Sequence, residues 1–201
     1  FAAPPVILRV DDSVIGTLGN FSASTGKAKS KKTFNVCAIV AAAMTGGTVL
    51  NYSASLPPER RRILYVDTEQ SRFHCKRVLC RILRLAGLPT DVHPPLLEFL
   101  CLRGYATKER LRKIEEAIYD LDDLGLVVID GIRDLAHDIN SPGEATDLIT
   151  KLMQWTDERR IHIHTVLHLN KGDDNTRGHL GTELNNKAET VLQITKDDFD
   201  R

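Results

Sequence analysis

A lysine-rich stretch between a strand-like and a helix-like segment has the residue types of a phosphate-binding loop. Residues 26–33 read Gly-Lys-Ala-Lys-Ser-Lys-Lys-Thr, which fits the pattern G-x-x-x-x-G-K-[ST] at Gly26, Lys32 and Thr33. Backbone N–H groups at the start of a helix carry partial positive charge and hold phosphate well. We therefore expect Lys32 to contact the outer phosphates of a nucleotide and assist catalysis, and the Thr33 hydroxyl to bind Mg²⁺.

Lys31 stands where this pattern has its second glycine. Glycine adopts backbone angles that lysine resists, so the pattern predicts nucleotide binding and leaves rapid hydrolysis open. Several lysines crowd the helix start, where cations oppose the helix dipole unless an anion is bound. A solvated lysine-rich loop is the alternative interpretation. The predicted nucleotide-binding residues are Gly26, Lys27, Ala28, Lys29, Ser30, Lys31, Lys32, Thr33 and Phe34.

Two later apolar segments end in carboxylates. Residues 127–130 read Val-Val-Ile-Asp, the usual form of a Walker B strand, so Asp130 is the second predicted Mg²⁺ ligand. Residues 63–69 read Ile-Leu-Tyr-Val-Asp-Thr-Glu, and Glu69 is the predicted general base for an attacking water. Ligands of parallel sheets bind at the carboxyl ends of strands. Helix capping or a turn is the alternative for each carboxylate, above all for Asp67.

A third apolar segment, residues 165–170, ends in polar groups. His168 or Asn170 is the predicted sensor of the γ-phosphate. The alternation of His162, His164 and His168 also suggests a metal site. However, no carboxylate or cysteine is spaced to complete that site, so His162 and His164 are expected to be ordinary strand residues.

The elements that must position these residues alternate between strand-like and helix-like patterns. We predict one three-layer α/β domain over residues 1–201, with a mainly parallel sheet flanked by helices and residues 1–14 as a peripheral strand. Predicted strands cover residues 6–10, 18–25, 63–66, 97–102, 126–129, 161–169 and 190–194. Predicted helices cover residues 32–44, 71–86 and about 107–121, with another opening at 141 and a short one near the end; polar loops cover 48–62 and 170–181.

The overall composition excludes some classes of protein. Lysine plus arginine and aspartate plus glutamate both number 27 among 201 residues, so any nucleic-acid contact must come from a local patch. No apolar run approaches the roughly 18 residues that cross a bilayer, and no signal peptide is evident. The four cysteines form no C-x-x-C pair and are expected to be buried thiols of a cytoplasmic protein. The chain begins at Phe1 rather than methionine, which leaves residues upstream of it an open question.

The order of these features resembles the RecA-like ATPase core over nearly the whole chain from about residue 15. Within that family the chain resembles hexameric plasmid replicative helicases and the accessory ATPases of mobilisable transposons (TnpC-type proteins). Residues 19–22 (Gly-Asn-Phe-Ser), 31–34 (Lys-Lys-Thr-Phe) and 177–182 (Arg-Gly-His-Leu-Gly-Thr) carry that resemblance. It implies a P-loop NTPase core, ATP and Mg²⁺ as ligands, Glu69 as the base, and a homo-oligomeric ring.

The resemblance also implies contacts outside the nucleotide site. Loops such as residues 170–181 line the channel of a ring, so Lys171 and Arg177 would touch single-stranded DNA. Arg177 or Lys187 would supply a basic finger to a neighbouring subunit. Asp173 and Asp174 oppose a DNA contact, and the loop has no aromatic residue, so a surface loop without a ligand is the alternative.

The predicted function is therefore Mg²⁺-dependent ATP binding and hydrolysis by a DNA-associated, helicase-type ring of a mobile element. A nucleotide-dependent regulatory or DNA-binding switch with weak or no hydrolysis is the alternative that Lys31 and the neutral net charge favour. A small-molecule kinase is a third possibility, which the long interval between the phosphate loop and Asp130 opposes.

Overall fold

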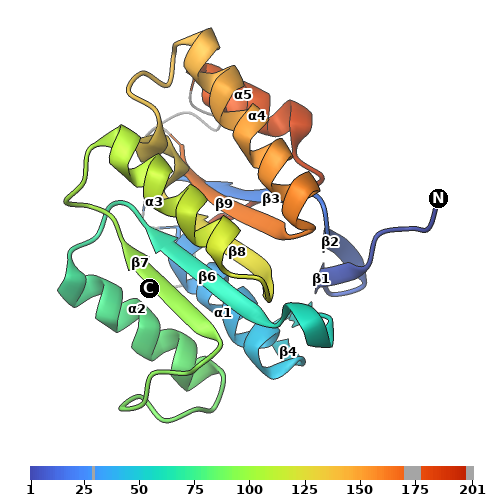
Figure 1. Cartoon of the computed structure of the whole chain (residues 1–201). Helices are drawn as coiled ribbons and strands as arrows, with labels where there is room; N and C mark the ends of the chain where they lie inside the picture. Colours follow the sequence, from blue (N-terminus) through green and yellow to red (C-terminus); the bar gives the residue numbers. More distant parts are fainter. Residues whose placement is uncertain (29, 170–177, 198–201) are drawn as a thin grey trace.

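The main sheet has six parallel strands. The computed structural model describes residues 1–28, 30–169 and 178–197. In spatial order the strands of this sheet are β10 (Val191–Gln193), β3 (Phe21–Gly26), β9 (His162–His168), β8 (Leu124–Asp130), β6 (Arg62–Asp67) and β7 (Leu97–Cys101), all paired in parallel (Figure 1). The prediction of a mainly parallel α/β sheet is confirmed.

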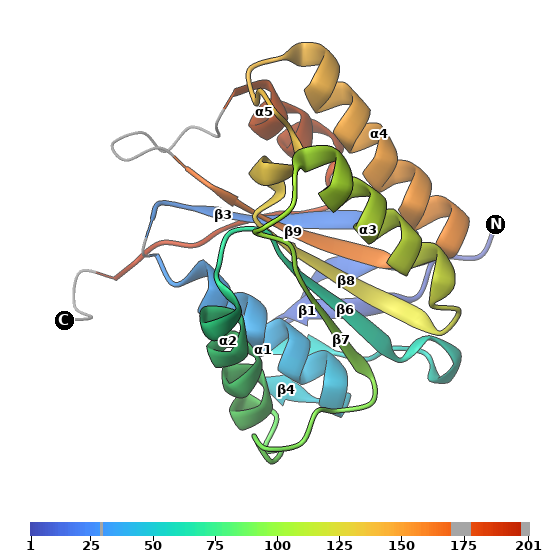
Figure 2. The ribbon, with the colours of Figure 1, turned by 60° about the vertical axis from the view of Figure 1, so that its left-hand side comes forward.

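Helices cover both faces of this sheet, which gives three layers. On one face lie α1 (Lys32–Thr45) and α2 (Arg72–Leu85), and on the other lie α3 (Thr107–Asp120), α4 (Pro142–Arg159) and α5 (Gly178–Lys187) (Figure 2). Every residue of β8 is buried, with Val128 in the apolar cluster beside α1 and Val127 in the cluster beside α3 and α4. This two-sided burial explains why the central strands are apolar throughout instead of alternating.

Parallel pairing brings the predicted site residues to one edge of the sheet. Asp67 and Asp130 are register partners at the carboxyl ends of β6 and β8. Gly26 and His168 are register partners at the carboxyl ends of β3 and β9. Because all these strands run in the same direction, their last residues meet at one edge, where ligands of such sheets bind.

A second, antiparallel sheet lies against α1 and was missed by the predicted element boundaries. Its strands are β1 (Val6–Val10), β2 (Ser13–Thr17), β4 (Thr48–Val49) and β5 (Tyr52–Ala54), in the order β2-β1-β5-β4. The prediction that residues 48–62 form only a loop is wrong, since β4, β5 and the 3-10 helix η1 (Pro58–Arg60) lie there. β4 and β5 are too short to show the alternation of apolar and polar residues that marks a strand. In addition, β5 pairs with β1, which is distant in the sequence.

Two other boundaries differ from the prediction. Residues 18–25 do not form one strand, because Gly19, with a φ of 89°, turns the chain between β2 and β3. The loop predicted for residues 170–181 is wrong at its end, because α5 begins at Gly178, while residues 170–177 lie outside the described part. The peripheral strand predicted in residues 1–14 corresponds to β1 and the start of β2.

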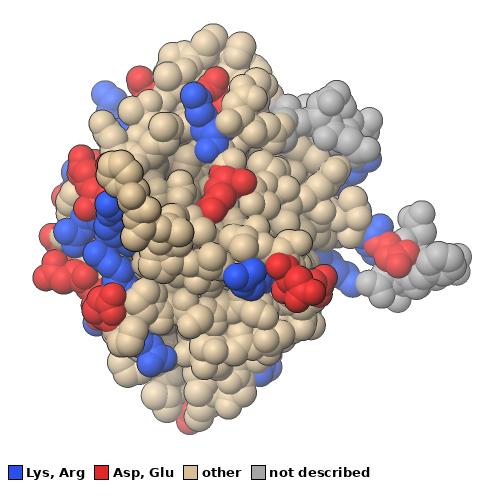
Figure 3. Space-filling view, turned by 90° about the vertical axis from the view of Figure 1, so that its right-hand side faces the viewer, with Lys and Arg blue, Asp and Glu red and all other residues tan. Residues whose placement is uncertain are grey.

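Cysteine burial and surface charge complete the description. All four cysteines are free thiols, and Cys37 and Cys75 are buried as predicted. Cys80 and Cys101 are only half-buried, so the prediction that all four thiols are buried is wrong for these two residues. On the face in Figure 3, acidic and basic side chains are interspersed and form no broad patch of one sign. Among the helices of the described ranges, none has the length and apolar content to cross a membrane.

Candidate functional site

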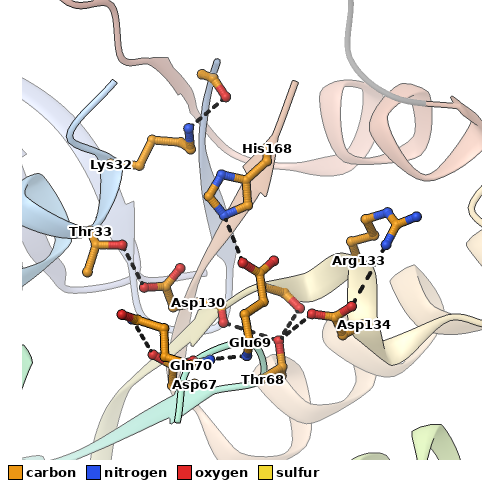
Figure 4. Close-up of polar contacts among 12 residues, drawn as sticks. Lys32, Thr33, Asp67, Thr68, Glu69, Gln70, Asp130, Arg133, Asp134 and His168 are labelled. Atoms are coloured by element: carbon orange, nitrogen blue, oxygen red, sulfur yellow. Dashed lines mark hydrogen bonds and ion pairs between the residues drawn. The ribbon is translucent and has the colours of Figure 1, made fainter. Parts of the chain in front are cut away.

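The turn after β3 surrounds the ammonium group of Lys32. Its Nζ donates to Gly26 O at 2.7 Å, to Lys27 O at 2.5 Å and to Ser30 Oγ at 3.1 Å. Lys32 is only 3% exposed. Burial lowers the pKa of its ammonium group, and the negative charges of Asp130 and Glu69 oppose that shift. A buried cation thus lies within a loop of backbone dipoles, close to two acids (Figure 4).

Lys31 adopts a left-handed backbone conformation, which glycine adopts more readily than lysine. It precedes the first residue of α1 with a φ of 64° and a ψ of 29°, in the left-handed region. A non-glycine residue there carries strain of about 1 kcal/mol. Gly26 is restricted for another reason, because a Cβ built on it would overlap Ile194 O and Ser30 Oγ. Lysine at position 31 therefore holds a backbone angle that glycine would adopt without strain.

Asp130 ends β8 and faces the first turn of α1. Its Oδ2 accepts hydrogen bonds from Thr33 Oγ1 at 3.1 Å and from Tyr65 OH at 2.8 Å (Figure 4 shows the Thr33 contact). Desolvation, followed by the neighbouring charge of Asp67, raises the pKa of Asp130 to about 6, while the two hydroxyl donors act in the opposite sense. Tyr65 was not singled out in the sequence. The available signal was its spacing of two from Asp67, which places both on the same face of a strand.

Asp67 holds the turn that carries Glu69. Its Oδ1 accepts the backbone N–H of Glu69 at 3.0 Å and of Gln70 at 2.9 Å, and its Oδ2 accepts from Gln70 Nε2 at 2.7 Å. These contacts correspond to the turn-capping alternative for this carboxylate. They fix the backbone of Glu69 relative to the end of β6.

Glu69 contacts His168 across the sheet edge. His168 Nε2 lies 3.4 Å from Glu69 Oε2, with side-chain exposures of 30% and 39% (Figure 4). The hydrogen bond from His168 lowers the pKa of Glu69, with burial opposing it and the charges of His168, Arg133 and Lys32 assisting. Arg133, on the 3-10 helix η2 (Ile132–Leu135), is a neighbour of the site that the sequence did not single out. The structure thus brings the predicted base and a predicted sensor together.

The phosphate loop borders one hollow, and a second hollow lies along α2. The first hollow has a volume of about 410 Å³ and is lined by Ser30, Lys31, Lys32, Thr33, Phe34, Arg81 and His168. A second hollow of about 660 Å³ is lined by Phe73, Lys76, Arg77, Cys80, Arg81, Arg84 and Leu85. Arg81 lines both, and its guanidinium lies 5.9 Å from the centroid of the Phe34 ring. Basic side chains therefore extend from the loop along α2.

Other predicted residues are not brought to this edge. Lys187 lies at the end of α5 and lines a different hollow with Gly19 and Asn20, near the amino end of β3. That is the opposite edge of the sheet from Gly26, since β3 runs between them. The predicted contacts Lys29, Asn170, Lys171 and Arg177 fall outside the described residues.

His162 and His164 form a closed hydrogen-bonded cluster with two serines inside the domain. His162 Nδ1 lies 2.8 Å from Thr17 O, and its Nε2 lies 2.7 Å from Ser22 Oγ. Ser22 Oγ lies 2.7 Å from His164 Nδ1, and Ser24 Oγ lies 2.7 Å from His164 Nε2. Burial lowers the pKa of His162 to about 4 and of His164 to about 3. Across the described ranges, no group of three or more His, Cys, Asp or Glu side chains is arranged to hold a metal by itself.

The residues at the sheet edge have the donor chemistry that Mg²⁺ requires beside a nucleotide. Mg²⁺ prefers hard oxygen ligands, and commonly takes one or two from the protein and the rest from phosphates and water. Thr33 supplies a hydroxyl and Asp130 a carboxylate, and the two are already in hydrogen-bond contact. The side chains present therefore fit a phosphate-bound Mg²⁺.

Comparison with known proteins gives the family. The family model described as an AAA domain matches residues 7–174. No curated protein matches the chain. The matched range covers most of the chain, including the phosphate loop, helices α1 to α4 and the acid at the end of β8, whereas α5 and β10 lie beyond it. The chain therefore belongs to the AAA domain family, a nucleotide-binding family of the ATPase type, and has a RecA-like P-loop core.

Proposed function

We propose that this protein binds ATP together with Mg²⁺ and hydrolyses it. The observation that supports this most is the convergence of Lys32, Thr33, Asp130 and Glu69 at one edge of the sheet. They come from three separate elements: the start of α1, the end of β8 and the turn after β6. Phosphoryl transfer depends mainly on positioning and electrostatic stabilisation, and these residues supply both.

Lys32 and the start of α1 would hold the phosphates. The ammonium group now donates to Gly26 O and Lys27 O, and phosphate oxygens are stronger acceptors because they are charged. Its burial places it where a cation interacts more strongly than in water. Thr33 and Asp130 would hold Mg²⁺, which supplies charge neutralisation of the phosphate oxygens when bound.

Glu69 is the proposed general base. Its carboxylate is ionised at neutral pH and can accept a proton from water, although the contact with His168 lowers its pKa and makes it a weaker base than an isolated glutamate. His168, in contact with Glu69 Oε2 and lining the hollow beside Lys32, is the proposed sensor of the γ-phosphate. A phosphate oxygen that accepts a hydrogen bond from His168 would compete with Glu69 for the same imidazole. Asn170 remains the other proposed sensor.

The finer biological role rests on the resemblance to helicase-type rings of mobile elements. We propose that residues 1–201 act as one cytoplasmic ATPase domain of a homo-oligomeric ring that associates with single-stranded DNA. Lys171, Arg177 and Lys187 are its proposed DNA or inter-subunit contacts. The location of Lys187 at the edge opposite its own phosphate loop is compatible with a contact to another molecule.

A nucleotide-dependent switch with weak hydrolysis is the second candidate. The observation that favours it is the engagement of Glu69 by His168, because a carboxylate oxygen that accepts a hydrogen bond from an imidazole is less available to water. The two candidates share the binding site and differ in turnover.

Turnover and binding of Mg²⁺-ATP, with and without single-stranded DNA, test the proposal. We expect Lys32→Ala to weaken nucleotide binding about 100-fold. Glu69→Gln should keep binding and lose about 100-fold or more in turnover. Lys108→Ala, an exposed lysine on α3, is the matched control and should change neither. Intact binding without turnover in the unaltered chain would favour the switch, and unchanged binding in Lys32→Ala would refute the phosphate-loop assignment.

A further inference from the structure

Tyr65 donates a hydrogen bond to the predicted metal ligand from inside the sheet. It lies in the middle of β6, is 0% exposed, and its hydroxyl is 2.8 Å from Asp130 Oδ2. Its ring is stacked on Phe99 of β7, with the ring centroids 4.7 Å apart and the planes inclined by 15°. The stacking and the strand backbone together hold the hydroxyl in one place.

The position of this hydroxyl follows from strand register. Tyr65 pairs with Val128 and Asp67 pairs with Asp130 in the parallel ladder between β6 and β8. Tyr65 is thus one side-chain step behind Asp67 on the same face, and its long side chain reaches forward to the end of the neighbouring strand. Among the residues of these two strands, it is the one whose hydroxyl contacts the Asp130 carboxylate in the described structure.

Asp130 needs such a donor for electrostatic reasons. Asp67 lies beside it, and two neighbouring carboxylates repel each other. Asp67 is held by the N–H groups of its own turn, whereas Asp130 is held by the hydroxyls of Tyr65 and Thr33. Thr33 is the other predicted Mg²⁺ ligand, so its hydroxyl oxygen must also serve the metal. Tyr65 has no such second task, and its contact with Asp130 can persist when the metal binds.

We propose that Tyr65 is a positioning residue of the metal–nucleotide site: its hydroxyl holds the Asp130 carboxylate in the orientation that faces Thr33. This role rests on the proposed function, because it requires Thr33 and Asp130 to hold Mg²⁺ beside the nucleotide. Tyr65 acts through Asp130 and does not itself touch the metal. Metal sites depend on such supporting hydrogen bonds to orient their ligands.

The chain contains a matched control for removing this hydroxyl. Tyr52 on β5 is 3% exposed and belongs to the same apolar cluster as Tyr65. Its hydroxyl also donates at 2.8 Å, but to Asn35 Oδ1 in the first turn of α1 and not to a predicted metal ligand. Tyr65→Phe and Tyr52→Phe therefore each remove one well-formed hydrogen bond from the same core and keep the ring.

Titration of a fluorescent ATP analogue, in EDTA and over a range of Mg²⁺ concentrations, tests the role. We expect Tyr65→Phe to raise the Mg²⁺ concentration needed for half-maximal tight binding about 10-fold, the usual scale for losing a supporting hydrogen bond. Its affinity for the analogue in EDTA should stay unchanged, which also shows that the variant is folded. Tyr52→Phe should match the unaltered chain in both conditions.

A double-mutant cycle separates positioning from a general loss of packing. If Tyr65 acts through Asp130, Tyr65→Phe should have no further effect on Mg²⁺ dependence in an Asp130→Ala background, which leaves the Tyr65 hydroxyl no carboxylate to hold. Equal, additive effects in both backgrounds would overturn the role, as would a Tyr65→Phe variant with the Mg²⁺ dependence of the unaltered chain. Nucleotide binding that is indifferent to Mg²⁺ in the unaltered chain would instead overturn the proposed function, and the role of Tyr65 with it.

Discussion

Two clusters of buried polar side chains lie on the same sheet and differ in the partners that their hydrogen-bonding and charged groups have. The histidine–serine cluster, made of Ser22, Ser24, His162 and His164, runs along the interior of β3 and β9. The carboxylate cluster, made of Thr33, Tyr65, Asp67 and Asp130, lies at the carboxyl ends of β6 and β8. Apart from Thr33, which is partly buried, every one of these side chains is almost fully buried.

The contrast lies in charge and access. In the histidine–serine cluster, neutral groups satisfy one another, and the lowered pKa values keep both imidazoles uncharged. In the carboxylate cluster, Asp67 and Asp130 lie side by side, and Asp130 interacts with the buried cation Lys32, which lines a hollow of about 410 Å³. Burial and hydrogen bonding alone therefore do not mark a functional site. Buried charges beside a hollow do indicate a functional site, because a ligand that enters the hollow can neutralise them.

Removing the central serine of the histidine–serine cluster should have the largest effect on stability. Ser22→Ala deprives both His162 Nε2 and His164 Nδ1 of a partner. Leaving buried polar atoms unsatisfied should lower the free energy of unfolding by about 3 kcal/mol. Urea unfolding measures this, and nucleotide affinity should not change.

Ser53→Ala is the control for that substitution. Its hydroxyl contacts Thr48 Oγ1 at 3.0 Å on the surface, so the expected loss is about 0.5 kcal/mol or less. A large change of nucleotide affinity in Ser22→Ala would break the distinction between the two clusters.

The two clusters should also titrate in opposite senses. The pKa values of His162 and His164 are lowered from 6.5 in the folded chain, so as pH falls these imidazoles bind protons in the unfolded chain before they do so in the folded one. The neutral histidines therefore contribute fully to the stability of the fold above pH 6.5, and this contribution is lost as pH falls below that value. The Asp130 pKa is raised from 3.8 to about 6, so its contribution favours folding as pH falls through that range. Two histidines outweigh one aspartate, and the free energy of unfolding should fall by about 2 kcal/mol between about pH 6.5 and about pH 5.

Urea midpoints measured across this range check the signs. In Asp130→Asn the opposing contribution is gone, so the fall with decreasing pH should be steeper than in the unaltered chain. A shallower fall in that variant would contradict the assignment of opposite senses.

At neutral pH, Asp130→Asn should stabilise the fold while it damages the site. The substitution removes a charge that burial disfavours and keeps an oxygen for the Tyr65 and Thr33 hydroxyls. We expect the free energy of unfolding to rise by about 1 kcal/mol. The Mg²⁺-dependent part of nucleotide binding should fall about 10-fold.

Asp123→Asn is the comparison for this variant. Asp123 is an acid whose pKa is lowered by its hydrogen bond with Arg62, so its neutralisation should not stabilise the fold or alter nucleotide binding. Calorimetric melting and nucleotide titration distinguish the two variants, and equal behaviour would show that burial of Asp130 is not the cause.

The smallest expected effect concerns the strained residue beside the carboxylate cluster. Lys31→Gly removes the cost of a left-handed lysine but increases the freedom of the unfolded chain, so a net gain of about 0.5 kcal/mol is expected. Arg160→Gly, at another left-handed position with a φ of 52°, should give a similar gain far from the loop. A loss of stability in Lys31→Gly alone, measured by urea unfolding, would show that the lysine side chain compensates its own strain.

The parts of the fold that could be predicted are those with strong local patterns. The apolar run before Asp130 and the one before Asp67 each form a central strand, and parallel pairing then places their ends together. The antiparallel sheet could not be predicted, because β4 and β5 have two and three residues and pair through contacts distant in sequence. Short strands of this kind carry no period that distinguishes them from a loop.

The main residues of the site could be named from the sequence, but only some of their contacts with one another could be predicted. Lys32, Thr33, Asp130 and Glu69 could be named from their positions after strands, although their roles remain predictions. The contact between Glu69 and His168 depends on side-chain conformations across three strands, which no spacing reveals. Tyr65 was hidden because a tyrosine in an apolar strand also fits simple core packing.

Lys31 has a consequence for how such loops are found in genomes. A text pattern for the phosphate loop tests for the letter G at this position, whereas in this folded loop lysine occupies it with a positive φ of 64°. Proteins with the same substitution would be passed over by a pattern that demands glycine. Describing the signature by its dihedral angle, and admitting lysine beside asparagine and glycine, would recover them.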